Sequence, residues 1–316
     1  MTGNRLIWHT FFLYSLPFLL LWLDGGLGLA LVLVLVALLA RWAIGLSVWV
    51  APAKVPAVQL DSIAVSHFVE KVRWCLDRLG IDYVEKRAAG TLGAFTVGRT
   101  VPRLKFSTGA VRSEIGNSAE ILRYLYGRYA AELGADAEFL APTKERVALE
   151  QDIDAIGVLL QQWVYYHVAG DREAALAAWG ARDPRTPAWQ RLLIRVGYPL
   201  LSTMIKRAFR VSAARHEKVL ARLTDTLGDF EDRLRDGRNT LLAGPAPDYC
   251  DFAFAAINSV WLRHDQFARG TSAPVRLAPE KLPEAMRNEI KQWSQRFPKV
   301  VAHFERLYRE ERLAHA

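Results

Sequence analysis

The chain has 316 residues, 51% of them hydrophobic, and a formal net charge of +8 at neutral pH. Such a length predicts two domains with an added segment, and the positive charge favours acidic ligands or an anionic membrane surface. No basic run is interleaved with aromatic residues, which argues against nucleic-acid binding, and the two cysteines form neither a disulfide framework nor a zinc-binding spacing, which indicates a reducing compartment.

Residues 1–56 are predicted to form a transmembrane hairpin and a linker. Two apolar runs, Leu6–Leu23 and Leu27–Ala40, are separated by a short turn that contains Asp24. Each run approaches the ~20 residues that span a bilayer. Basic residues precede the first run and follow the second, so the positive-inside tendency predicts that both ends face the cytoplasm, with the lipid bilayer as a partner. A single long span is the alternative.

Residues 57–130 are predicted to form an α/β domain. Short alternating or apolar segments indicate strands at residues 58–63, 81–85, 101–106 and 110–115. An amphipathic pattern predicts a helix over residues 69–79, and Asn117 or Ser118 is a natural N-cap for a second helix. This order predicts a four-stranded mixed sheet with helices on its faces.

Pro102 and the start of the second helix suggest a binding site in this domain. Proline donates no hydrogen bond to a neighbouring strand, so Pro102 marks a strand edge. The free amide groups at the N-terminus of the helix that begins near Asn117 and Ser118 favour an anion. Together these features suit a ligand with a carboxylate and an extended peptide backbone. An ordinary turn and helix cap are the structural alternative.

Residues 131–316 are predicted to be helical, with breaks at Gly and Pro clusters. Helices are expected at residues 143–168, 187–210, 212–236 and 248–261, with two more over residues 283–312, divided at Pro298. Asp248 and Asp251 have the spacing of an acidic capping box at the start of a largely apolar central helix. The mixture of basic and apolar residues between 187 and 210 suits contact with a membrane surface.

Four segments, in the correct order and spacing, resemble motifs of the cytosolic glutathione S-transferases. Residues 66–73, Ser-His-Phe-Val-Glu-Lys-Val-Arg, resemble the Ser/Cys-Pro-Phe-x-x-Lys-x-Arg signature that opens the first helix of that family. Val101-Pro102 resembles the family's cis-proline, and Asn117-Ser118 resembles its Glu/Asp-Ser pair. Residues 244–251 resemble the Pro-Ser-x-x-Asp start of a buried helix. The resemblance covers residues 58–312.

The resemblance implies roles for five residues. Ser66 would be the catalytic residue, whose hydroxyl stabilises the thiolate of glutathione; capping of the helix is the alternative role. The backbone of Val101, before Pro102, would bind the cysteinyl part of glutathione. Ser118 would bind the γ-glutamyl carboxylate. Asn117 stands where the family has an acidic partner for the γ-glutamyl amine, and therefore offers no charge there.

The resemblance also implies a fold and a substrate class. A thioredoxin-like glutathione-binding domain (residues 57–130) would precede an all-helical bundle domain (residues 131–316). Trp163, Tyr165 and Tyr166 would line the pocket for a hydrophobic electrophile, although aromatic residues at this spacing equally suit a core. Glutathione would be the co-substrate, no metal is expected, and homodimers are usual in the family.

Three functions stay open at this point. The first is a membrane-anchored glutathione transferase whose active face lies in the cytoplasm. The second is a non-catalytic binding or adaptor protein that uses the same fold. The third is a glutathione-dependent isomerase or peroxidase.

Overall fold

The computed structural model describes residues 19, 21, 26–50, 57–89, 101–108, 111–271 and 276–312. The chain forms two compact units. One comprises residues 1–57 and 106–113, and the other comprises residues 58–105 and 114–316. The boundary predicted at residue 130 falls inside helix α6 (Ser118–Leu133), which belongs to the larger unit.

Helix α3 (Leu27–Val50) belongs to the smaller unit. Its exposed apolar side chains, each 49% to 65% accessible, are Leu27, Leu29, Leu31, Val32, Leu35, Val36, Leu38, Leu39 and Trp42. Within the described residues, no helix combines the length and the apolar character that crossing a membrane requires. The predicted transmembrane hairpin is therefore not supported, and its first run, Leu6–Leu23, lies almost wholly outside the described residues.

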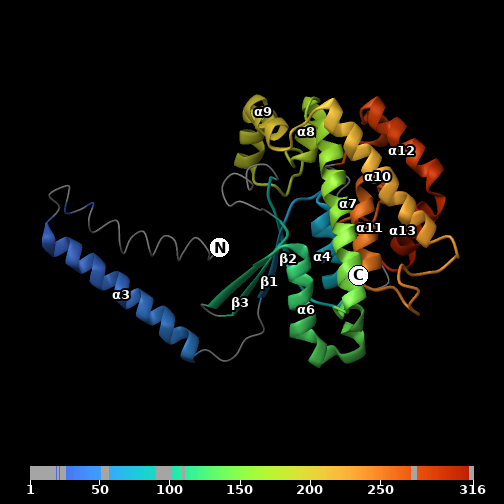
Figure 1. The fold of residues 1–316 in the computed structure, drawn as a ribbon. Coiled ribbons are helices and arrows are strands. Elements are labelled where there is room, and N and C mark those ends of the chain that lie inside the picture. Colours follow the sequence, from blue (N-terminus) through green and yellow to red (C-terminus); the bar gives the residue numbers. More distant parts are fainter. Residues whose placement is uncertain are drawn as a thin grey trace. The chain divides into compact units, whose positions relative to one another are not determined.

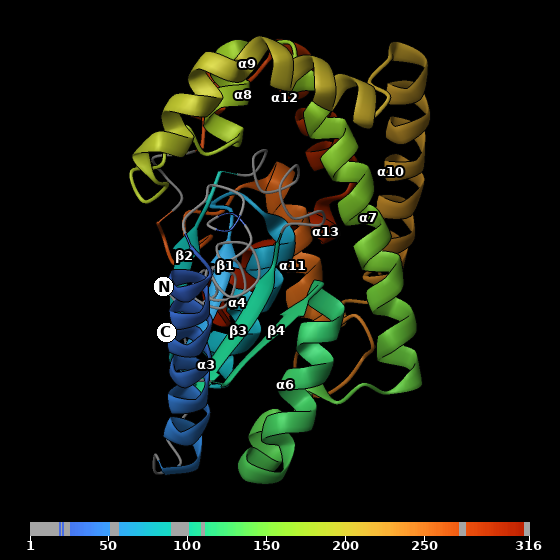
Figure 2. The same cartoon turned by 90° about the vertical axis from the view of Figure 1, so that its left-hand side faces the viewer.

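A four-stranded sheet has the order β2-β1-β3-β4 (Figure 2). Its strands are β1 (Ala57–Ser62), β2 (Val84–Arg87), β3 (Arg103–Thr108) and β4 (Val111–Gly116). Strands β1 and β2 are parallel, with Gln59 opposite Val84. Val58, Leu60 and Ser62 are buried, because alternate side chains of a strand share one face. The predicted thioredoxin-like sheet is confirmed, although its second strand begins at Val84 instead of residue 81.

Helix α4 (His67–Arg78) follows β1 and packs against α6 and against α11 (Tyr249–Leu262). Its apolar face is completely buried at Val69, Val72 and Leu76. These residues recur at the spacing of three and four positions that an amphipathic helix presents to a core. The helix predicted from this spacing is confirmed and begins two residues earlier than expected.

The remaining helices form the predicted all-helical part (Figure 1). They are α7 (Lys144–Val168), α8 (Arg172–Ala178), α9 (Ala188–Ala208), α10 (Ala213–Arg233), α12 (Glu284–Arg296) and α13 (Pro298–Glu310), with short 3-10 helices at Gly134–Leu140 and Pro279–Lys281. Helix α7 packs against α10 and α11. The expected capping box starts the buried helix α11: Asp248 caps it, and the Asp251 carboxylate accepts the Asp248 N–H at 3.1 Å.

Buried ion pairs connect α4 with the C-terminal end of the described chain. Glu70 accepts hydrogen bonds from Arg73 at 3.1 Å and from Arg312 at 2.9 Å, and all three side chains are 0% exposed. Arg312 also donates to Asp77 at 2.7 Å. Burial opposes the charge of Glu70, but the two guanidinium groups prevail and lower the pKa of its carboxyl. These pairs fix the last residues of the described chain onto the first helix of the thioredoxin-like part.

Candidate functional site

A cleft of about 1060 Å³ lies within the larger unit. Its lining comes from the turn between β1 and α4, from the segments before β3 and α6, from α7, α8, α9 and α12, and from the C-terminal end of α11 with the segment that follows it. The lining is mostly apolar and contains a few polar side chains. Such a site suits a small ligand with an apolar part.

Ser66 lines this cleft and is also the N-cap of α4. Its Oγ accepts the N–H of Val69 at 3.4 Å, and its backbone is extended, as is usual for an N-cap. A hydroxyl that accepts one hydrogen bond still carries a hydrogen that it can donate. Ser66 therefore caps the helix, and its hydroxyl hydrogen can still be donated to a ligand.

Val101 and Pro102 form a second part of the lining. The peptide bond between them is cis, as the resemblance implied, and Pro102 is buried. The two residues directly precede β3, whose first residue is Arg103. The backbone of Val101 therefore lies at the end of a strand beside the cleft.

Asn117 and Ser118 form a third part of the lining, at the N-terminus of α6. Asn117 caps the helix: its side-chain oxygen accepts the N–H of Ala119 at 3.1 Å, and its φ is +69°. Asparagine tolerates this left-handed region better than most residues. Ser118 is buried at 3% exposure, whereas Asn117 is exposed. Three segments that are distant in sequence thus meet at one cleft.

His67 lines the cleft beside Ser66 and is 7% exposed. Burial lowers the pKa of its imidazole to about 4, and a hydrogen bond to the backbone of Gly157 only partly offsets this effect. The ring is therefore neutral at physiological pH. Within the described residues its Nε2 atom is buried without a partner.

Asp154 is the one acidic residue in the described lining of the cleft, and no sequence motif pointed to it. It lies on α7, and Lys71 of α4 donates to its two oxygens at 2.8 and 3.0 Å. Lys71 also pairs with Glu150 at 2.7 Å. Burial raises the pKa of the Asp154 carboxyl, although Lys71 opposes that shift. A quarter of this side chain remains exposed, so a cationic ligand group can reach it.

Only one of the three predicted pocket aromatics lines the cleft. Tyr165 does, but Trp163 and Tyr166 are absent from the lining. Trp163 is completely buried and donates its indole N–H to Glu289 at 2.5 Å. Tyr166 stacks on His216 with ring centroids 3.8 Å apart. The apolar part of the lining includes Val158, Val164, Val168, Trp179, Phe209 and Met286.

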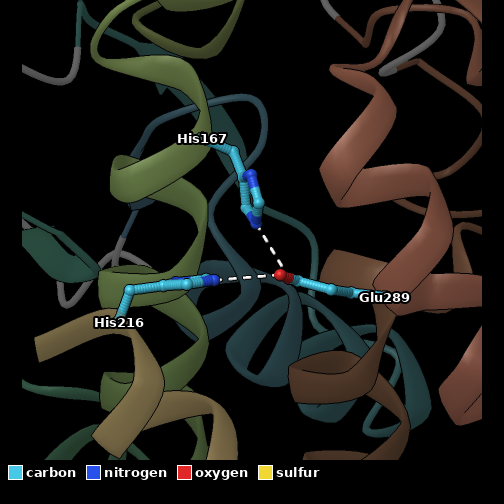
Figure 3. Close-up of side chains that lie close together, drawn as sticks. All are labelled: His167, His216 and Glu289. Carbon is cyan, nitrogen blue, oxygen red and sulfur yellow. Dashed lines mark hydrogen bonds and ion pairs between the residues drawn. The ribbon is translucent and has the colours of Figure 1, made fainter. Parts of the chain in front are cut away.

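A group of side chains outside the cleft could hold a metal ion (Figure 3). His167 of α7, His216 of α10 and Glu289 of α12 place one ligand atom each within 4.8 Å of the others. In this structure both Nε2 atoms instead lie 2.9 Å from the Glu289 carboxylate. With Trp163, that carboxylate has three hydrogen-bond partners, which lower its pKa to about 2 although burial opposes the shift. These hydrogen bonds connect helices α7, α10 and α12.

Both cysteines of the chain are buried away from solvent. Cys75 lies in α4 and Cys250 in α11, and each is 0% exposed. Burial raises the pKa of both thiols well above the ordinary value. Neither belongs to the lining of the cleft.

No family model and no curated protein matches this sequence. Among solved structures, glutathione S-transferase III in its apo form is 18% identical, with 81% of this chain and 93% of that chain covered and a TM-score of 0.47. A theta-class glutathione S-transferase of Xanthomonas axonopodis pv. citri, with glutathione bound, is 18% identical over 81% and 95%, with a TM-score of 0.45. A beta-etherase of Sphingobium sp. strain SYK-6 is 15% identical over 79% and 99%, with a TM-score of 0.46.

The likeness is one of fold. At these identities and TM-scores it extends to no residue and no activity. The chemistry of the cleft follows from its own side chains.

Proposed function

We propose that the cleft binds glutathione and activates its thiol for attack on an apolar electrophile. The observation that carries this proposal is the meeting of Ser66, the cis Val101–Pro102 segment and Ser118 on one cleft. Each group matches a different part of a γ-glutamyl tripeptide. The apolar remainder of the lining suits the second substrate.

Ser66 would act on the sulfur. A thiol with a pKa near 8.5 is mostly protonated at neutral pH, and the thiolate is the nucleophile. The Ser66 hydroxyl would donate a hydrogen bond to the thiolate, and the N-terminus of α4 would add partial positive charge in the same direction. Both effects lower the pKa of the bound thiol. The sulfur then bonds to the electrophilic carbon, the leaving group departs with the electron pair of its bond, and the thiol proton passes to water.

The other groups would hold the tripeptide in place. The backbone of Val101 would pair with the cysteinyl unit, and Ser118 with the free amides of α6 would bind the γ-glutamyl carboxylate. Asn117 supplies no negative charge for the γ-glutamyl ammonium. Asp154, on the same cleft, is the acidic side chain that would take this role.

Calorimetric titration of glutathione into the full chain tests the proposal, together with mass spectrometry of the product formed with 1-chloro-2,4-dinitrobenzene. Glutathione should bind, and the conjugate should form faster than in buffer. Ser118→Ala should weaken binding by about 1–3 kcal/mol, because it removes a partner of a carboxylate in a largely buried position. Absence of binding to the parent chain would overturn the proposal.

We further propose that the smaller unit attaches the protein to a membrane. Support comes from the exposed apolar side chains of α3, which include Leu31, Leu35 and Trp42. Apolar surface of this extent is favourably removed from water by lipid. The expected result is that the full chain sediments with neutral lipid vesicles at high salt. Replacing Leu31, Leu35 and Leu38 together by Gln should release it to the supernatant.

A further inference from the structure

Two arginines, Arg263 and Arg276, line the same cleft as Ser66. Arg263 ends helix α11 at a φ of +58°, and Arg276 follows 13 positions later in the sequence. Both donate hydrogen bonds to carbonyl oxygens: Arg263 donates to Leu277, and Arg276 donates to Ser259 at 3.0 Å. The Arg276 guanidinium also lies 4.0 Å from the centroid of the Phe267 ring.

Arg263 and Arg276 are half-buried, whereas the three fully buried arginines of the larger unit are paired with carboxylates. Arg73 lies 2.6 Å from Glu85, Arg87 lies 3.1 Å from Asp183, and Arg312 lies 2.7 Å from Asp77. Within the described part of the chain, no carboxylate lies within 4.0 Å of Arg263 or Arg276, in contrast to these pairs. Residues 264–275 separate the two in sequence and contain one acid, Asp265, and residues 272–275 are Ser-Ala-Pro-Val.

The pKa shifts of these arginines also differ from that of the paired Arg73. Burial lowers the pKa of Arg263, and Glu280 offsets that shift only in part. Burial lowers the pKa of Arg276 to about 10; Arg263 and Arg73 act in the same direction, and Tyr308 and Glu70 oppose the shift only in part. By contrast, Glu85 and Glu70 raise the pKa of Arg73 although burial opposes them. An arginine side chain stays charged at neutral pH, and among the described residues the buried Nη1 atom of Arg263 has no hydrogen-bond partner.

We infer that the second substrate of this cleft is an anion: an apolar molecule with a carboxylate or sulfonate that pairs with Arg263 and Arg276. A charge partly removed from water without an anionic partner is costly, and a planar guanidinium matches the two oxygens of such a group. Val260, Leu277, Leu282 and Met286 line the cleft with these arginines and suit the apolar body of the molecule. The inference rests on the proposed function, because it specifies which electrophiles the activated thiol meets.

Two aryl chlorides that react in the same way test this inference. Thiolate attack on the ring carbon of 4-chloro-3,5-dinitrobenzoate or of 1-chloro-2,4-dinitrobenzene forms the thioether and releases chloride, and only the first compound carries a carboxylate. Each rate is divided by the uncatalysed rate with glutathione in buffer. The parent should show the larger ratio for the benzoate. Arg263→Met and Arg276→Met should each lower kcat/KM for the benzoate by about tenfold or more and leave the neutral substrate within about twofold.

Matched variants separate charge from folding. Arg263→Lys and Arg276→Lys keep the charge and should retain part of the preference for the benzoate. Arg222→Met removes one positive charge from the exposed surface of α10 and should leave the ratio unchanged. Equal losses for both substrates in folded Met variants, or no preference in the parent, would overturn the inference.

Binding experiments distinguish this failure from failure of the proposed function. Unreactive 3,5-dinitrobenzoate, titrated without glutathione, should bind the parent and lose affinity in both Met variants, whereas 1,3-dinitrobenzene should not distinguish them. Loss of glutathione affinity in the variants, with unchanged binding of the benzoate, would assign the arginines to a glutathione carboxylate and overturn the inference. If glutathione does not bind the parent at all, the proposed function fails, and the benzoate titration still decides whether the arginines form an anion site.

Discussion

The Ser66 hydroxyl caps helix α4, and we propose that it also donates a hydrogen bond to the bound thiolate. A substitution tests these two roles separately. Ser66→Ala should raise the pKa of bound glutathione toward its solution value, by about one unit or more, because the thiolate loses a donor; one unit corresponds to about 1.4 kcal/mol. The rate at pH 7 should fall by about tenfold and recover as pH rises. Ultraviolet titration of the bound thiolate gives the pKa directly.

A second N-cap serine provides the control for that prediction. Ser212 caps α10 through the N–H of Arg215 at 3.3 Å, in the same way as Ser66 caps α4, and does not line the cleft. Ser212→Ala should cost about 1 kcal/mol of stability, as Ser66→Ala should, without changing the thiol pKa. A parental pH–rate profile in folded Ser66→Ala would reduce Ser66 to a helix cap.

Asp154 is expected to recognise the γ-glutamyl ammonium in place of Asn117. Asp154→Asn should weaken glutathione binding by about 1–3 kcal/mol, because the ammonium loses a charged partner in a partly buried site. A glutathione analogue without the α-amino group should bind the parent and Asp154→Asn equally. Calorimetry with both ligands measures the difference. An equal loss of affinity for the two ligands would mean that Asp154 only holds the Lys71 side chain in place.

At the scale of elements, Gly157 shows how closely α7 packs. A Cβ there would lie 2.7 Å from Phe68 and 2.8 Å from Ile257 of α11. Gly157→Ala should therefore destabilise the protein by about 1–3 kcal/mol, although alanine is the better helix former. Gly127→Ala in α6, where a Cβ would meet nothing within 4 Å, should stabilise it by about 0.5–1 kcal/mol. Urea unfolding of both variants measures whether each raises or lowers the free energy of unfolding.

Local signals predicted the elements well but could not assign side chains to core or cleft. The caps Ser66, Asn117 and Asp248 could be predicted because capping depends on neighbours in sequence. Trp163 and Tyr165 lie two positions apart on one helix, yet one is in the core and the other at the cleft. Which helix covers each of them is decided by distant residues, and so is the pairing of Lys71 with Asp154.

For the whole molecule, Arg312 holds the two ends of the larger unit together. Arg312→Met should destabilise it by about 3–5 kcal/mol, because Glu70 and Asp77 lose a partner in a buried position. Arg309→Met removes an exposed arginine of α13 that pairs with Glu310, and should change stability by at most about 0.5 kcal/mol. Urea unfolding at pH 7 compares them. Similar stabilities for the two variants would contradict the structural role of Arg312.

The stability of the folded protein should also decrease as the pH falls. The pKa values of Glu85 and Glu289 are lowered to about 2 in the folded protein, although burial opposes both shifts. Carboxyls with depressed pKa values stabilise the fold above their unfolded pKa and lose this contribution as pH falls through the folded value. The urea midpoint should therefore decrease between about pH 5 and pH 2. Glu289→Gln should lower the midpoint at pH 7 and reduce its dependence on pH in that window; an unchanged dependence would contradict the ion pairing.

The burial of Cys75 and Cys250 should protect the protein from alkylation by electrophilic substrates. A catalyst that handles electrophiles is exposed to alkylation, and the thiolate is the side-chain group most prone to it. Here the chain's two thiols are inaccessible and held protonated. Glutathione in the cleft would then be the thiol presented to the reagent. Intact-mass spectrometry after prolonged incubation with an aryl chloride should show the unmodified chain, whereas the same treatment in denaturant should add two aryl groups.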